Sequence, residues 1–113
     1  MNVSTQTDGA NELGEERFDQ EVLASDVPVL VDFGAEWCPP CRALAPTIDA
    51  LASEYAERAK VVKVDVDASP RLTATYGIQS IPTVLVFKAG QVVRRFVGLT
   101  GMAELRGALD RAG

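Results

Sequence analysis

The chain has 113 residues, of which 47% are hydrophobic and 24% are charged, as is typical of one globular domain with its own apolar core. Its formal charge is −5 at pH 7, and it has no run of Lys and Arg that could follow nucleic-acid phosphates or an anionic membrane surface. No apolar stretch approaches the ~20 residues that span a bilayer, so we expect neither nucleic acid nor a membrane as a partner.

The N-terminal segment is polar, and we expect residues 1–9 to form a mobile tail ahead of one domain at residues 10–113. This segment has no basic residue before its first acid and no apolar centre, so it lacks the pattern of a secretory signal peptide. We therefore expect a cytoplasmic protein. In that compartment a pair of cysteines is more often redox-active or metal-binding than a permanent structural bridge.

Hydrophobic spacing predicts strands that alternate with helices along the rest of the chain. Near-continuous apolar runs indicate strands covered on both faces, and apolar residues spaced by three or four positions indicate helices. Pro46 lies inside the longest helical pattern and should kink that helix. The order β-α-β-α-β-α-β-β-α predicts an α/β sheet with helices on both faces. The predicted strands are 10–13, 29–33, 61–66, 83–87 and 92–97, and the predicted helices are 15–24, 38–58, 70–75 and a last helix capped by Thr100.

Both cysteines lie in one motif, WCPPC, at residues 37–41. A disulfide between two residues so close in sequence closes almost no loop, so it would stabilise the fold poorly. A structural zinc site needs four Cys or His ligands, whereas this chain has two Cys and no His. The motif therefore predicts thiol–disulfide chemistry and no metal site. An inert motif and a site shared between two copies in a dimer are the alternatives.

The position of the motif predicts a role for each thiol. Cys38 lies at the start of a helix, where free N–H groups and the helix dipole stabilise a thiolate and lower the pKa of the thiol. Cys41 lies one turn further along, so it should be more buried and harder to ionise. Cys38 would attack a substrate disulfide, and Cys41 would resolve the mixed disulfide. Pro39 and Pro40 suit the first turn of a helix and should stiffen the pair.

Three further residues are unusual for a core. Asp32 interrupts the apolar run VLVDF, where burial would raise the pKa of its carboxyl and suit it to accept the proton of Cys41. A partly solvated strand end is the alternative for this residue. Lys63, in the strand VVKVDV, could pair with Asp32 or could be a surface lysine at a strand edge. Pro82 directly precedes a buried strand, which marks a tight loop and permits a cis bond.

These features together resemble the thioredoxin family. The likeness covers about residues 13–112 and includes VDFGAEWCPPC, KVDVD, YGIQSIPT, FKAG, the helix proline at 46 and the glycine at 98. The resemblance implies a thioredoxin fold, with a five-stranded mixed central sheet flanked by four helices. Counted along the chain, the strands would lie across the sheet in the order first, third, second, fourth and fifth.

The resemblance also implies a role for each site residue. Cys38 would be the nucleophile and Cys41 the resolving thiol, with Asp32 and Lys63 as a buried acid–base pair. A cis bond after Ile81 would face the thiols, and an extended client segment would pair with the backbone there. The surface that contacts clients would be formed by Trp37, Pro39, Pro40, Ile81, Pro82 and Gly98.

The resemblance implies partners as well. Disulfide-containing proteins would be the clients, and a flavin-dependent thioredoxin reductase using NADPH would re-reduce the chain. The chain would bind no cofactor itself, and we expect it to be a monomer. Two residues depart from the family pattern: Pro39 stands where Gly is usual, and Gly34 stands where an aromatic residue is common. Pro39 should affect the redox potential, and Gly34 should loosen packing beside the active site. The competing functions are a pathway-dedicated reductase and a non-catalytic binding module.

Overall fold

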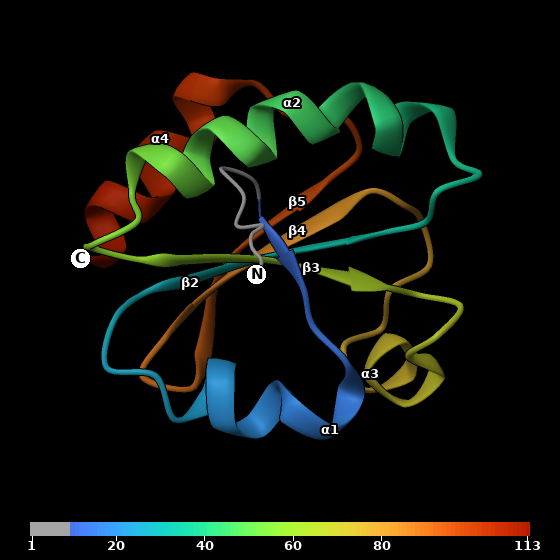
Figure 1. Ribbon diagram of the computed structural model, residues 1–113, viewed down its shortest axis with the longest axis horizontal. Coiled ribbons are helices and arrows are strands. Elements are labelled where there is room, and N and C mark those ends of the chain that lie inside the picture. The colour runs from blue at the N-terminus through green and yellow to red at the C-terminus, as the bar shows by residue number, and fades with distance from the viewer. Residues whose placement is uncertain (1–9) are drawn as a thin grey trace, which may run out of the picture.

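A five-stranded sheet forms the middle layer of the computed structural model, which describes residues 10–113 (Figure 1). The strands are β1 (Asn11–Glu12), β2 (Val29–Gly34), β3 (Lys60–Asp65), β4 (Thr83–Lys88) and β5 (Gln91–Val97). They lie in the order β1-β3-β2-β4-β5. β1 and β2 run parallel to β3, whereas β4 is antiparallel to β2 and β5. The expected mixed sheet and its strand order are confirmed, while the expected tail at residues 1–9 lies outside the described residues.

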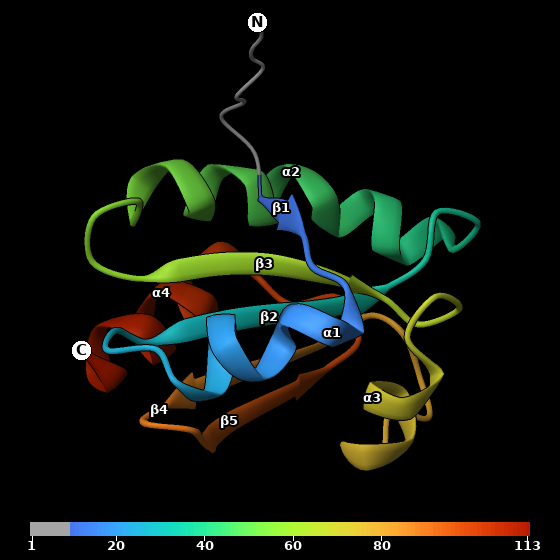
Figure 2. The same cartoon turned by 60° about the horizontal axis from the view of Figure 1, so that its bottom comes forward.

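Helices cover both faces of this sheet (Figures 1 and 2). The helices α2 (Pro39–Glu54) and α4 (Met102–Ala112) lie on one face, and α1 (Glu15–Phe18) and α3 (Pro70–Thr75) lie on the other. A five-residue π-helix, η1 (Asp19–Leu23), continues α1. Within residues 10–113, no helix has both the length and the apolar character needed to cross a bilayer.

The helix ends differ in detail from the predicted ones. α2 ends at Glu54, earlier than expected, because the chain turns there toward β3. The expected cap of the last helix is also wrong. The Thr100 hydroxyl donates to the Gly98 carbonyl at 3.0 Å, so it does not cap α4. Instead Gly101 is the N-cap residue, and its N–H donates to Glu104 Oε1 at 3.4 Å.

Two apolar layers hold the sheet between its helices. Successive strand residues send their side chains to opposite faces, so both faces of a central strand are covered by buried groups. The layer under α2 and α4 includes Leu30, Leu44, Ile48, Leu51, Val84, Val86, Leu105 and Leu109. The layer under α1 includes Phe18, Val22, Val29, Val31, Phe33, Leu85 and Phe87. β2 lies between these layers, and its residue Asp32 is therefore buried in the interior.

Candidate active site

The two cysteines lie at the junction of β2 and α2 and form a disulfide, with their Cα atoms 5.2 Å apart. Cys38 is the N-cap residue of α2, and the exposed Pro39 and Pro40 occupy its first two positions. Proline suits those positions because an N–H there has no partner within the helix. The Cys41 N–H donates to Cys38 Sγ at 3.3 Å. This N–H and the helix dipole both favour negative charge on the Cys38 sulfur.

The burial of the two cysteines differs from the prediction. Cys38 is 3% exposed and Cys41 is 8% exposed, so the expectation that Cys41 is the more buried residue is wrong. The carbonyl oxygen of Ile81 lies 3.8 Å from Cys38 Sγ and helps to cover it. Cys41 instead borders a cavity beside Gly34, which has no side chain to fill that space.

The residues expected to contact clients include neighbours of Cys38 in sequence and the loop before β4. The Ile81–Pro82 peptide bond is cis, and Pro82 is buried. The Pro82 carbonyl accepts a hydrogen bond from the Gly98 N–H at 2.8 Å, and Gly98 has a φ of +92°, which favours glycine. Trp37 is 63% exposed, and its indole N–H donates to Asp67 Oδ2 at 2.7 Å. Asp67 lies two residues after the end of β3, the strand that carries Lys63, and no role was predicted for it.

Asp32 lies on β2 and is only 6% exposed, so it is not a partly solvated strand end. Its Oδ1 has no hydrogen-bond partner among the described residues. Burial raises the pKa of this carboxyl to about 6; the positive charge of Lys63 opposes the rise, and the negative charge of Asp49 adds to it. A carboxyl with this pKa can both hold and release a proton near neutral pH.

Lys63 lies beside Asp32 in the parallel register of β2 and β3, but the two described side chains form no direct ion pair. The ammonium group of Lys63 lies 3.4 Å from Asp49 Oδ1 on α2. These two side chains are 33% and 44% exposed, so pairing them costs less desolvation than burying the ammonium group beside Asp32. Asp49 is one of two acids in α2, and no sequence pattern distinguished it as a partner of Lys63.

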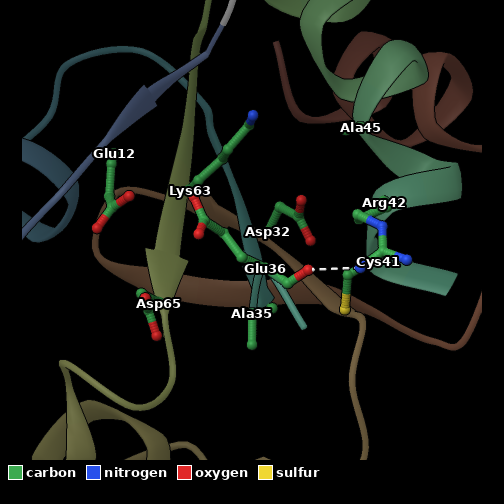
Figure 3. Close-up of a pocket in the computed structure, with 10 residues that line it drawn as sticks. Glu12, Asp32, Ala35, Glu36, Cys41, Arg42, Ala45, Lys63 and Asp65 are labelled. Atoms are coloured by element: carbon green, nitrogen blue, oxygen red, sulfur yellow. Dashed lines mark hydrogen bonds between the residues drawn. The ribbon is translucent and has the colours of Figure 1, made fainter. Parts of the chain in front are cut away.

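A cavity of about 180 Å³ opens beside Cys41, and neither Cys38 nor Ile81 is among its lining residues (Figure 3). Cys41, Asp32 and Lys63 all line it, so three of the residues predicted to be catalytic share one space. On the rim, Arg42 Nη1 donates to the backbone carbonyl of Glu36 at 2.8 Å, the dashed line in Figure 3. Residues 10–113 contain no group of three or more His, Cys, Asp or Glu arranged to hold a metal ion.

Known proteins are similar in sequence to nearly the whole chain. The thioredoxin family model matches residues 9–111. The chain is 48% identical over 102 residues to Thioredoxin 1 of Nostoc sp., covering 90% of this chain and 95% of that protein. It is 50% identical over 94 residues to Thioredoxin 1 of Synechococcus elongatus, covering 83% and 88%. It is 44% identical over 111 residues to a thioredoxin of Porphyra purpurea, covering 98% and 97%. With its paired cysteines at the start of α2, the chain belongs to the thioredoxin family of thiol–disulfide oxidoreductases.

Proposed function

We propose that residues 10–113 act as one thioredoxin domain, a general protein disulfide reductase in which Cys38 is the nucleophile and Cys41 the resolving thiol. The observation that carries this assignment is the position of Cys38 Sγ at the N-terminus of α2, 3.3 Å from the Cys41 N–H. In the reduced protein this N–H and the helix dipole stabilise a thiolate on Cys38. Cys41 lies inside the helix and has no comparable place at the helix end.

The reaction proceeds by two displacements. The Cys38 thiolate attacks a client disulfide, a bond forms between Cys38 and one client sulfur, and the other client sulfur leaves as a thiolate. Asp32 accepts the proton of Cys41, since both groups line the same cavity. The Cys41 thiolate then attacks Cys38 Sγ and releases the second client thiolate. Lys63 acts on Asp32 through its charge, which lowers the pKa of the carboxyl and keeps part of it ionised.

The client approaches on the side of the disulfide formed by the loop before β4. The Ile81 carbonyl lies 3.8 Å from Cys38 Sγ, so backbone along which an extended client segment can pair is next to the reacting sulfur. Trp37 is exposed beside it and offers an apolar contact. The surface that we assign to client binding consists of Trp37, Pro39, Pro40, Ile81, Pro82 and Gly98.

Continued turnover requires a source of electrons for the oxidised chain. We assign this role to a thioredoxin reductase that contains flavin and uses NADPH, so that these cofactors belong to the partner. The cytoplasm is the compartment we propose, because its reducing systems keep such dithiols ready to react. The chain acts as a monomer in this proposal, since one copy supplies every residue assigned to the site.

Trapping of the mixed disulfide tests these roles. Cys41→Ser keeps the nucleophile but removes the resolving thiol, so it should form a stable mixed disulfide with an oxidised model protein at Cys38. The matched variant Cys38→Ser should form far less of this adduct under the same conditions. Mass spectrometry of the digested adducts measures both. Equal trapping by the two variants, or stronger trapping by Cys38→Ser, would contradict the assignment.

A further inference from the structure

The two sulfurs of the disulfide have different neighbours, and only Cys41 borders a cavity. Cys38 Sγ lies 3.8 Å from the Ile81 carbonyl oxygen, whereas Cys41 lines the cavity of about 180 Å³. This volume is many times the ~10–15 Å³ that one water requires. A small ligand that enters the cavity therefore meets Cys41 and not Cys38.

Gly34 is the residue that leaves Cys41 uncovered. A Cβ atom at this position would lie 3.1 Å from Cys41 Sγ and 3.4 Å from Cys41 Cβ. The first distance is tighter than ordinary packing allows, so any larger side chain would press on the sulfur and occupy the adjoining space. The absence of a side chain at Gly34 therefore exposes one side of Cys41 to the cavity.

A buried acceptor without a partner borders the same space. The point where a Cβ of residue 34 would lie is 4.0 Å from Asp32 Oδ1. This oxygen has no hydrogen-bond partner among residues 10–113, and Asp32 is 6% exposed. A buried acceptor without a hydrogen bond is costly, so a donor that reaches Asp32 from the cavity is stabilised.

The charges around the cavity favour a cationic donor. Both cations in its wall already have partners: Lys63 pairs with Asp49 at 3.4 Å, and Arg42 donates to the Glu36 carbonyl at 2.8 Å. Carboxylates outnumber cations in the wall, so the local potential attracts an ammonium group more than it attracts an anion. The acidic residues of the wall are Glu12, Asp32, Glu36 and Asp65.

We propose that the cavity beside Gly34 admits small aliphatic thiols that carry an ammonium group, and that these thiols reduce the oxidised chain by attacking Cys41. The ammonium group binds toward Asp32 while the sulfur reaches Cys41. The proposal rests on the reversible Cys38–Cys41 chemistry proposed above. It gives the chain a source of electrons that is independent of a protein reductase.

The chemistry requires two equivalents of the thiol. The first thiolate forms a bond to Cys41 Sγ, the bond between the two cysteine sulfurs breaks, and Cys38 leaves with the electron pair. Cys38 is the better leaving group because the end of α2 stabilises its thiolate, and a more stable leaving thiolate speeds exchange. A second thiolate attacks the sulfur of the bound thiol, forms the small disulfide and releases the Cys41 thiolate. Each small thiol loses its proton to solvent, and the two cysteines take up two protons or remain ionised.

Three thiols of similar size and different charge test the proposal. The oxidised chain is mixed with cysteamine, 2-mercaptoethanol or 3-mercaptopropionate, and the rate of disulfide reduction is divided by the thiolate concentration. We expect cysteamine to react at least about tenfold faster than 3-mercaptopropionate, with 2-mercaptoethanol between them. Acid quenching followed by alkylation and fragment mass spectrometry should find the mixed disulfide on Cys41 and the alkyl group on Cys38. Equal rates for the three thiols, or an adduct on Cys38, would overturn the proposal.

Two variants fill the cavity from different walls. Gly34→Leu and Ala45→Leu should each lower the rate of reduction by cysteamine at least about tenfold. The differences in rate among the three thiols should also disappear. Ala45→Leu decides the matter if Gly34→Leu does not fold. Unchanged cysteamine rates in folded variants would contradict the proposal. Reduction of a model protein disulfide by the prereduced wild-type chain is measured in parallel. Failure of this reaction would refute the proposed function. If the reaction proceeds but the three small thiols react at equal rates, only the role of the cavity is refuted.

Discussion

Different kinds of chemical group lie on the two sides of the disulfide. On the client side, Cys38 meets backbone groups: the Ile81 carbonyl at 3.8 Å and the Cys41 N–H at 3.3 Å. On the cavity side, Cys41 borders the open space beside Gly34, and the titratable carboxyl of Asp32 lines the same space. Backbone N–H and C=O groups do not titrate, whereas the Asp32 carboxyl gains or loses a proton near neutral pH. We infer that the fold fixes the geometry of attack, while a few side chains set the proton balance.

The largest expected effect comes from the client side. Cys38→Ser should lower the rate of reduction of a model protein disulfide at least about 1,000-fold, because the attacking sulfur is gone and the helix end has no thiolate to stabilise. Turnover with a chemical reductant as the electron source measures this. Trp37→Phe serves as a folded control at the same surface. A Cys38→Ser variant with wild-type turnover would refute the assigned nucleophile.

The next effect comes from Asp32 on the cavity side. Asp32→Asn should slow resolution of the mixed disulfide about 10- to 100-fold, because it removes the proton acceptor for Cys41. It should also stabilise the fold at pH 8, since it removes a buried charge. The rise in the Asp32 pKa from 3.8 to about 6 corresponds to roughly 3 kcal/mol. The free energy of unfolding should increase by no more than this amount.

The pH dependence of stability follows from the same pKa. The folded chain binds the Asp32 proton more tightly than the unfolded chain, so this group favours folding most below pH 4. Its contribution is lost as the pH rises from 3.8 through about 6, and it changes little above pH 7. Urea unfolding between pH 4 and pH 8 should therefore show a smaller fall for Asp32→Asn than for the wild type. The exposed residue Asp26 provides the control, and an equal response in Asp26→Asn would count against this account.

Opposite charges near Asp32 should shift the pH profile in opposite directions. Lys63→Met removes the positive charge that lowers the Asp32 pKa, so the pH midpoint of resolution should rise. Asp49→Asn removes the negative charge that raises this pKa and also frees Lys63, so the midpoint should fall. Each change should alter the rate at neutral pH by only about two- to fivefold. Stopped-flow resolution rates measure both variants, and shifts in the same direction would show that their charges do not act through Asp32.

The smallest expected effect lies at the exposed rim of the client side. Trp37→Phe keeps an aromatic contact but loses the hydrogen bond from the indole N–H to Asp67. Because Trp37 is exposed, the free energy of unfolding should change by less than about 1 kcal/mol. KM for a model client should rise a few-fold while kcat stays near that of the wild type. A large fall in kcat would place Trp37 in the chemical steps.

Local patterns in the sequence predicted the order of strands and helices along the chain, whereas the order of the strands across the sheet came from the resemblance to thioredoxins. The apolar run that contains Asp32 predicted its burial, and the position of WCPPC before a helical pattern predicted a disulfide pair at the start of α2. The partner of Lys63 could not be predicted, because it depends on how α2 lies across β3 and brings Asp49 within 3.4 Å. The order of burial of the two cysteines also depends on tertiary structure. It follows from the loop at Ile81, distant in sequence, and from the cavity beside Gly34.

Competitive alkylation of the reduced chain tests the division between the two sulfurs most directly. A limiting amount of iodoacetamide is added at pH 7, and fragment mass spectrometry locates the label. The account predicts that Cys38 carries at least about tenfold more label than Cys41, because only Cys38 lies where the end of α2 stabilises a thiolate. Equal labelling of the two cysteines, or preferential labelling of Cys41, would contradict it.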